Sequence, residues 1–368
     1  MNPYRPDKID LHREFVVAVA RGNHPPPIRV QLVLSDLCNQ DCSFCAYRME
    51  GYSSNELFFQ RDELDNIVSR NPKRMLTAEK ALEVVRDCKE MGVKAIELTG
   101  GGEPTVHPQI DDVIRLVKES GMDVGLVTNG VRLKPSTIAL MAQRGVESWI
   151  RISIDAGTPE TYSHIRRVSA AHWDQVWKNI ELAVAMRQAV PDSPLVLSVS
   201  FILTKENWHE VRLAAERARD AGVDSFRVAP MFQNEGAAYF DRFSTQAQNI
   251  CNELKSLVTP RFAVHSQLMK RIGELIAGRP TESNCLYQRA ATYVAADMNV
   301  YRCCVNAYNE LGKLGSIANQ SFRQVWERVG EEAPFGSFDA TQCPFCPFSD
   351  RQKAIGDALS SVKHGTFV

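Results

Sequence analysis

Three cysteines on one short stretch are the residues whose types and spacing most directly specify chemistry. Cys38, Cys42 and Cys45 form a C-x3-C-x2-C pattern. Three thiolates can hold three irons of a four-iron cluster, and the fourth iron can then bind a small molecule. An electron-transfer cluster normally has four cysteine ligands, so this pattern predicts chemistry at the open iron. The alternatives are half of a zinc site or unrelated thiols; zinc usually takes a fourth nitrogen or sulfur ligand, and the nearest histidines are His24 and His107.

The spacing resembles that of the radical S-adenosylmethionine (SAM) superfamily, whose open iron chelates the amine and carboxylate of SAM. A glycine run, Gly100-Gly101-Gly102-Glu103-Pro104, matches the family element that takes the SAM amino group, and glycine lets a ligand approach the backbone closely. The guanidinium of an arginine suits bidentate pairing with the SAM carboxylate. The resemblance implies that SAM is bound by Phe44, Gly101, Gly102, Glu103, Asn129, Ser153, Arg166 and Ser200.

A second group of cysteines lies near the C-terminus. The segment between its members predicts a hairpin strand at 296–303 and a helix at 322–329, and it resembles the twitch domain, a shortened SPASM extension that holds one auxiliary [4Fe-4S] cluster. The resemblance implies electron transfer by that cluster. A structural zinc ribbon is the alternative. Cys304 is an alternate ligand, a hydrogen-atom donor or a small core residue. The ligands implied for the auxiliary cluster are Cys285, Cys303, Cys343 and Cys346.

Strands and helices alternate regularly between the two cysteine groups. Strands are predicted at 28–34, 93–99, 124–128, 148–154, 195–202 and 225–229, and helices at 77–91, 108–120, 135–144, 173–190 and 208–221. This alternation indicates a parallel sheet covered by helices. Six such units are too few to close an eight-stranded barrel, so we predict an α/β fold: a partial (β/α)6 TIM-like barrel with a small C-terminal hairpin-and-helix twitch domain. The first cysteines follow the first strand and therefore lie at the barrel mouth.

The regions outside this alternation are assigned by position and composition. We expect an N-terminal arm at 1–27, the radical SAM barrel at 28–232, a helical bridge at 233–282, the auxiliary-cluster domain at 283–350 and a tail at 351–368. The stretch 46–74 is longer than most connections. It is either a lid or substrate-facing insertion, with a helix near 60–68, or a solvated surface excursion. Its candidate substrate contacts are Tyr47, Arg48, Glu50 and Tyr52.

The composition limits the possible partners. The 43 Lys and Arg residues nearly balance the 44 Asp and Glu residues, which argues against an electrostatic grip on nucleic acid or an anionic membrane. No apolar run is long enough to span a bilayer or to form the core of a signal peptide. Clustered cysteines suit metal binding in a reducing compartment. We therefore expect a cytoplasmic protein with neither a membrane nor a nucleic-acid partner.

The resemblance also implies a reaction. The reduced cluster would split SAM into methionine and a 5′-deoxyadenosyl radical that removes a hydrogen atom from the substrate, with a flavodoxin- or ferredoxin-type protein as external electron donor. If the auxiliary cluster takes the substrate's electron, the chain is an oxidoreductase acting on a sugar, cyclitol or nucleoside derivative. The alternatives are radical modification of a peptide (crosslink, epimerisation or maturation), which the short N-terminal arm disfavours, and redox-neutral isomerisation or dehydration. A non-enzymatic, metal-stabilised binding protein would leave the open ligand position unexplained.

Overall fold

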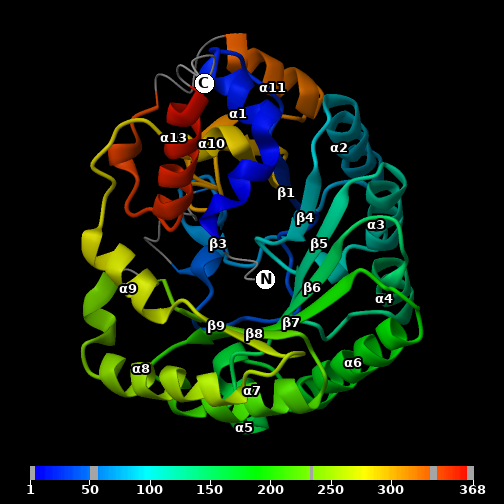
Figure 1. Ribbon diagram of the computed structural model, residues 1–368, viewed down its shortest axis with the longest axis vertical. Helices are drawn as coiled ribbons and strands as arrows, with labels where there is room; N and C mark the ends of the chain where they lie inside the picture. The colour runs from blue at the N-terminus through cyan, green and yellow to red at the C-terminus, as the bar shows by residue number, and fades with distance from the viewer. Residues whose placement is uncertain (1–4, 50–56, 233–234, 332–337, 363–368) are drawn as a thin grey trace.

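The computed structural model describes residues 5–49, 57–232, 235–331 and 338–362. One ten-stranded sheet, in the order β12-β11-β10-β1-β4-β5-β6-β7-β8-β9, curves through the described part of the molecule (Figure 1). Its strands from β10 to β9 are parallel, whereas β11 and β12 continue it antiparallel. The strands are β1 (Arg29–Val33), β4 (Ala95–Thr99), β5 (Asp123–Thr128), β6 (Ser148–Ser153), β7 (Leu195–Leu203), β8 (Ser225–Pro230), β9 (Ala263–Ser266), β10 (Ala291–Val294), β11 (Asn299–Tyr301) and β12 (Lys313–Ser316).

Helices cover the outer face of this sheet (Figure 1). Thr77 caps the first of them, since its hydroxyl accepts a hydrogen bond from the Lys80 backbone N–H at 3.2 Å. Gly92, with φ of 85°, ends the same helix. The predicted α/β partial barrel is therefore confirmed. The helices are α2 (Ala78–Met91), α3 (Ile110–Glu119), α4 (Pro135–Ala142), α5 (Pro159–Arg166), α6 (Ala171–Gln188), α7 (Val211–Asp220), α8 (Ser244–Glu253) and α9 (Leu268–Ala277).

The main hydrophobic core lies between the sheet and these helices. Strand side chains alternate between the two faces of a sheet, so every second residue points outward. Outward residues such as Ile96, Ile150 and Phe226 are fully buried in the core. Their neighbours along each strand point into the barrel and are more polar. This division places chemistry-bearing side chains inside the barrel.

The sheet extends further than the sequence predicts. Strand β9 lies within the segment 233–282, which was expected to be mostly helical, and pairs with β8 through Ser225 and Ala263. Its four residues, Ala-Val-His-Ser, carry too short an alternation to reveal a strand. On the other side, β10 pairs with β1, and Arg29 lies opposite Ala291. The second cysteine group is thus attached directly to the barrel sheet.

Helices from both chain ends pack together beside the second cysteine group. Helix α13 forms in the tail, where the sequence predicted no element, and its Ile355 packs with Phe15 and Val16 of α1. Figure 1 shows α13 beside α1. No helix in the described ranges has the length and apolar content needed to cross a membrane. The remaining helices are α1 (Arg13–Ala20), α10 (Tyr287–Ala290), α11 (Phe322–Glu331) and α13 (Ser349–Val362).

The stretch 46–74 contains a short hairpin, β2 (Gln60–Arg61) and β3 (Ile67–Ser69), so the predicted helix near 60–68 is wrong. The reason is local turn chemistry. The Asp62 carboxylate accepts hydrogen bonds from the backbone N–H groups of Leu64 at 3.0 Å and Asn66 at 2.8 Å, and such bonds compete with a helix. The candidate contacts Glu50 and Tyr52 lie outside the described residues.

Candidate functional site

The three predicted cysteine ligands lie close together on the loop that follows β1. The pKa of Cys38 and of Cys42 is raised to about 11, mainly by burial; the charges of Glu103 and the Cys42 thiol contribute to the rise at Cys38, and the Cys45 thiol contributes to it at Cys42. The Arg48 guanidinium acts in the opposite direction on both thiols, and the Arg166 guanidinium does so on Cys42. Thiolate ligands and the cluster that they hold are negatively charged, so these two arginines offset the charge that a bound cluster would bring.

Arg48 and Asn71 fix the backbone of the cysteine loop. The Asn71 side chain accepts a hydrogen bond from the Cys38 backbone N–H at 3.0 Å and donates one to the Cys38 carbonyl at 3.1 Å. Buried Arg48 donates to the Asn71 side chain at 2.7 Å and to the Gln40 carbonyl at 2.5 Å. Part of the long insertion therefore holds this loop in place. A substrate contact for Arg48 stays a prediction, and these bonds identify a positioning role that the sequence did not reveal.

The glycine run packs against the stem of the same loop. A Cβ atom on Gly101 would lie 2.7 Å from the Asp36 carboxylate and from the Tyr308 hydroxyl. A Cβ atom on Gly102 would lie 2.5 Å from the Asp36 carbonyl oxygen. The Gly102 and Glu103 backbone N–H groups donate to loop carbonyls at 3.0 Å. The glycines therefore allow two backbone segments to meet; their contact with SAM stays a prediction.

Glu103 ties the end of β4 to the end of β5. Its buried carboxylate accepts hydrogen bonds from the hydroxyl groups of Thr105 and Thr128, each at 2.6 Å, and from the Asn129 backbone N–H at 2.7 Å. The Asn129 side chain in turn donates to Asn39 of the cysteine loop at 2.8 Å. Among the predicted SAM contacts, Glu103 and Asn129 are thus connected to each other and to the loop.

Ser153, Ser200 and Arg166 also meet beside the cysteine loop. The two serines are opposite each other on β6 and β7, and their hydroxyl oxygens are 3.3 Å apart. Arg166 donates to the Ser153 carbonyl at 2.8 Å and to the Gln40 side chain at 2.5 Å, and it forms a buried ion pair with Asp155. Its guanidinium carbon lies 5.9 Å from the centre of the Phe44 ring. The structure therefore brings four predicted SAM contacts together.

A buried aromatic cluster joins the cysteine loop to the C-terminal hairpin. The Tyr47 and Tyr293 hydroxyl groups are 3.1 Å apart, and both rings lie near Tyr308. The Tyr308 hydroxyl donates a hydrogen bond to the Asp36 carboxylate, which also accepts one from Arg74 at 2.8 Å. Tyr47, a candidate substrate contact, belongs to this cluster. No local sequence pattern predicts the cluster, because its members come from distant segments.

We expect replacement of Tyr308 by phenylalanine to lower the free energy of unfolding by about 1–3 kcal/mol, the usual range when a buried charged acceptor loses a hydrogen bond. Burial raises the pKa of Asp36 to about 6, so this carboxyl depends on its remaining partners. Urea unfolding of protein with matched iron content measures the effect. The control is Tyr239→Phe, which removes a half-buried hydroxyl that accepts from the Lys205 backbone N–H. An equal shift for both variants would contradict the argument.

The four cysteines of the second group also come together, from the segments around α10, β11 and the start of α13. Burial, followed by the thiols of Cys346 and Cys343, raises the pKa of Cys285. Burial, followed by the thiols of Cys304, Cys285 and Cys343, raises the pKa of Cys303. Cys304 also interacts with Arg29 and Glu97, whose side chains are on the inner face of the barrel. The neighbouring thiols of Cys303 and Cys304 thus have different surroundings.

The number of thiols in each set matches the cluster proposed for it. In the part of the chain that the structure describes, no three His, Cys, Asp or Glu side chains are placed to hold a single metal ion. Cluster ligands bind different irons and are spaced more widely than the ligands of one zinc ion. The first set offers three thiols and the second set offers four, as the two proposed clusters require.

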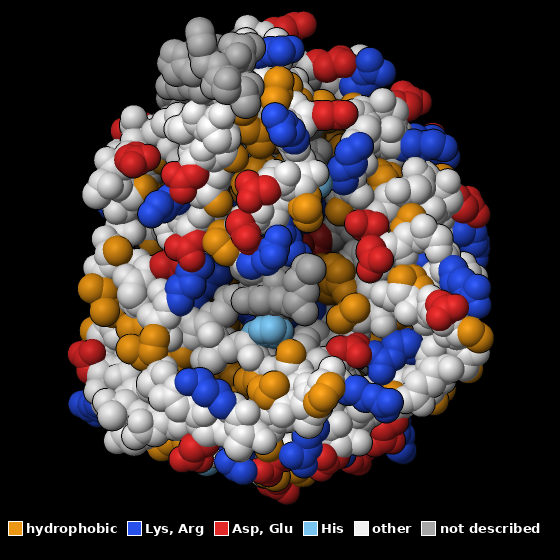
Figure 2. All heavy atoms as spheres, in the orientation of Figure 1, with side chains coloured by type: hydrophobic (Ala, Val, Ile, Leu, Met, Phe, Trp, Pro, Cys, Tyr) orange, Lys and Arg blue, Asp and Glu red, His pale blue; other side chains and the backbone are white. Residues whose placement is uncertain are grey.

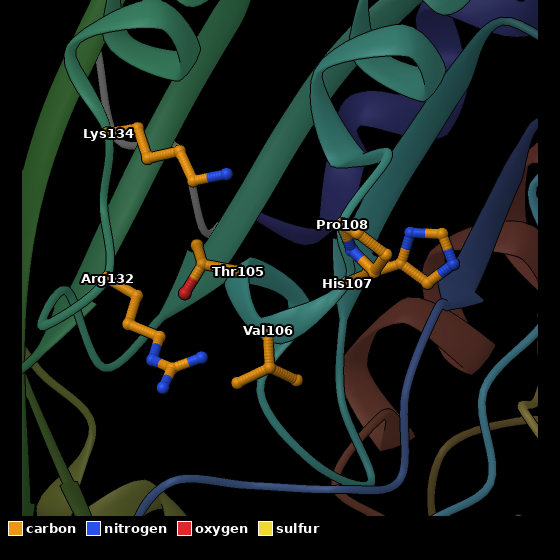
Figure 3. Close-up of a pocket in the computed structure, with 6 residues that line it drawn as sticks. All are labelled: Thr105, Val106, His107, Pro108, Arg132 and Lys134. Atoms are coloured by element: carbon orange, nitrogen blue, oxygen red, sulfur yellow. The ribbon is translucent and has the colours of Figure 1, made fainter.

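An open surface cavity of about 440 Å³ lies elsewhere (Figure 3). It is lined by the segment from Thr105 to Pro108 and by Arg132 and Lys134. Figure 3 shows Arg132 and Lys134 on one side of this space and Thr105 and Val106 on the other. None of the cysteines lines the cavity. We therefore place the chemistry at the cysteine loop and not here.

The chain is similar in sequence to several known proteins. The model of the Radical SAM superfamily matches residues 32–218. A probable GTP 3′,8-cyclase of Saccharolobus islandicus is 29% identical over 201 residues, covering 54% of this chain and 55% of the relative. An AdoMet-dependent heme synthase of Methanosarcina barkeri is 24% identical, covering 84% of each chain. The chain spans about half the length of the cyclase.

Among solved structures, SuiB of Streptococcus suis bound to its precursor peptide SuiA has a similar fold. The TM-score is 0.59 at 15% identity, and the match covers 89% of this chain and 70% of SuiB. At this identity the likeness concerns the fold alone.

Proposed function

The chain belongs to the radical SAM superfamily, and from this membership we propose that it is an oxidoreductase that uses SAM and two [4Fe-4S] clusters to oxidise a small molecule. The observation that carries the proposal is the convergence of three thiols on the loop after β1, with two guanidinium groups beside them. Four further thiols gather next to the barrel sheet and fit an auxiliary cluster.

The proposed site divides the work between the cofactors and the protein. When bound at Cys38, Cys42 and Cys45, the cluster and SAM would supply a 5′-deoxyadenosyl radical. The residues of the chain position these groups and shield them from water. Arg48 would hold the cysteine loop in place. Arg166 lies 4.0 Å from the Cys42 sulfur, where its positive charge would offset the negative charge of the thiolate. The proposed SAM contacts are Phe44, Gly101, Gly102, Glu103, Asn129, Ser153, Arg166 and Ser200.

The auxiliary cluster is the reason for proposing a net oxidation. Four cysteine ligands leave no open iron, so such a cluster is suited to accept an electron and not to bind substrate. The auxiliary cluster would lie directly beside the barrel, because β10 and β11 join the second cysteine group to the barrel sheet. Its proposed ligands are Cys285, Cys303, Cys343 and Cys346. The names of the cyclase and the heme synthase support a small-molecule substrate. Similarity to the cyclase also favours a second candidate function, which is a redox-neutral radical reaction on a small molecule.

Anaerobic reconstitution tests the proposed function. We expect about eight irons per chain, and 5′-deoxyadenosine should form when the protein is reduced in the presence of SAM. Iron analysis and chromatography of the reaction products measure the two quantities. A protein with full iron content that forms no 5′-deoxyadenosine would refute radical SAM chemistry. Product formation that leaves the oxidation state of the substrate unchanged would favour the redox-neutral candidate.

A further inference from the structure

A buried arginine lies among the thiols of the second cysteine group. Arg302 directly follows β11 and is 8% exposed. Its guanidinium carbon lies 4.4 Å from the centre of the Phe338 ring, which packs against Cys285 and Cys343. The thiols of Cys285, Cys303 and Cys343 all act electrostatically on this guanidinium. Arg302 is therefore beside three of the four proposed ligands of the auxiliary cluster.

Arg302 lacks the carboxylate partner that a buried guanidinium usually has. On the face shown in Figure 2, Lys and Arg side chains are interspersed with Asp and Glu side chains. In the part of the chain that the structure describes, Arg302 forms no ion pair: it donates to the neutral Gln288 side chain at 2.6 Å, and its Nε has no hydrogen-bond partner. Asp339, whose charge acts on Cys343, accepts its hydrogen bonds from Thr341 instead, at 2.7 and 3.0 Å.

A buried cation without a carboxylate needs another source of negative charge. Protonated thiols are neutral and do not supply it, whereas thiolates bound to an iron–sulfur cluster do. The unpartnered Nε and the uncompensated charge of Arg302 therefore fit a negatively charged, thiolate-bound metal centre at the second cysteine group.

Asn306 adds a hydrogen-bond donor to the same group. This residue is buried, and its side-chain nitrogen donates to the Cys343 sulfur at 3.1 Å. Gly312 allows this placement, since a Cβ atom on it would lie 1.9 Å from the Asn306 carbonyl oxygen. Net charge and hydrogen bonds to the sulfurs are two of the factors that set the reduction potential of an iron–sulfur cluster.

The cations beside the first cysteine set have different partners. Arg48 forms an ion pair with Asp41 at 3.2 Å, and Arg166 forms its buried pair with Asp155. Carboxylates therefore offset positive charge at the first set, whereas no carboxylate among the described residues pairs with Arg302. Because reduction adds negative charge to a cluster, an uncompensated cation nearby stabilises the reduced state more than the oxidised state.

We infer that Arg302, with Asn306 beside Cys343, raises the reduction potential of the auxiliary cluster and so favours its reduction by one electron. The inference rests on the proposed function, because it explains how the second cysteine group could act as an electron acceptor. Arg302 would act through the cluster and would not contact the substrate. Its effect should therefore be visible in the potential itself, without any substrate present.

A redox titration tests this inference. The anaerobic sample is the full chain with Cys38, Cys42 and Cys45 all replaced by alanine, so that only the auxiliary cluster should contribute an electron paramagnetic resonance signal on reduction. The potential is measured in this background with Arg302 intact and with Arg302→Gln, which removes the charge. We expect the glutamine variant to lower the equilibrium constant for reduction at least tenfold, equivalent to about 59 mV for one electron.

Two further variants separate charge from packing. Arg302→Lys keeps the positive charge, so its potential should stay closer to that of the unaltered position. Asn306→Ala removes the hydrogen bond to Cys343 and should lower the potential by a smaller amount. If Arg302→Gln does not hold the cluster, Arg302→Lys should still hold about four irons, and loss of the cluster from the lysine variant as well would overturn the inference.

The matched control is Arg323→Gln, the same substitution at an exposed residue of α11 that pairs with Glu327 at 2.7 Å. It should leave the potential unchanged when samples of equal iron content are compared. A potential for Arg302→Gln equal to or above that of this control would overturn the inference and leave the auxiliary cluster in place. Zinc instead of iron at the second site of the unaltered protein would refute the proposed acceptor cluster and the inference with it.

Discussion

Replacement of Cys42 by alanine is expected to reduce the rate of 5′-deoxyadenosine formation by at least about 1,000-fold, equivalent to about 4 kcal/mol of activation free energy. The proposed first cluster would have three cysteine ligands, so loss of one would leave two irons without a protein ligand. Cys42 also lies 4.0 Å from the Arg166 guanidinium, and its replacement removes the thiolate that this charge offsets. Iron content should fall from about eight to about four per chain. Iron analysis and the SAM cleavage assay measure both effects, and alanine at Cys38 or Cys45 should act alike.

The chain provides matched controls for this experiment. Cys88 on α2 and Cys251 on α8 are buried thiols in the main hydrophobic core. Alanine at either position should cost on the order of 1 kcal/mol of stability through a small cavity. It should leave iron content and SAM cleavage intact. Retention of the cluster and of cleavage by the Cys42 variant would refute the site, as would an equal iron loss in the two controls.

The alternation of strands and helices could be predicted because each element carries its own periodic pattern. Helix α2 shows why the agreement is close: Thr77 and Gly92 mark its two ends through local hydrogen bonding and backbone conformation. The cysteine loop could be placed at the barrel mouth because it follows the first strand of a parallel sheet. Local sequence was sufficient for these features.

Contacts between distant segments could not be predicted in this way. The hydrogen bond from Tyr308 to Asp36 joins residues 272 positions apart, and no local pattern marks either residue as a partner. The pairing of β10 with β1 is equally remote, and it determines that the second cysteine group lies beside the barrel. The place of Arg302 among the thiols of the second group became recognisable only from the arrangement of these segments in space. Strands with a clear apolar pattern could therefore be placed along the sequence, whereas their arrangement across the sheet could not.

Alanine at Cys343 is expected to separate SAM cleavage from substrate oxidation. Cys343 accepts a hydrogen bond from the Asn306 side chain at 3.1 Å and is one of the four thiols proposed for the auxiliary cluster. Its loss should remove about four irons and lower the rate of substrate oxidation by roughly 100-fold or more, or about 2.7 kcal/mol. 5′-Deoxyadenosine should still form, because the first three cysteines are untouched.

Cys304→Ala is the matched control, since this thiol is adjacent to Cys303 in sequence but interacts with Arg29 and Glu97 inside the barrel. It should keep about eight irons, whereas Cys303→Ala should lose about four. Full substrate turnover by the Cys343 variant would show that the second site is not an electron acceptor. Metal analysis that finds about four irons and one zinc ion in the unaltered protein would replace the auxiliary cluster by a structural zinc site. In that case an oxidation would have to return the substrate's electron to the first cluster or pass it to an external acceptor, and the proposed role of the second site would be withdrawn.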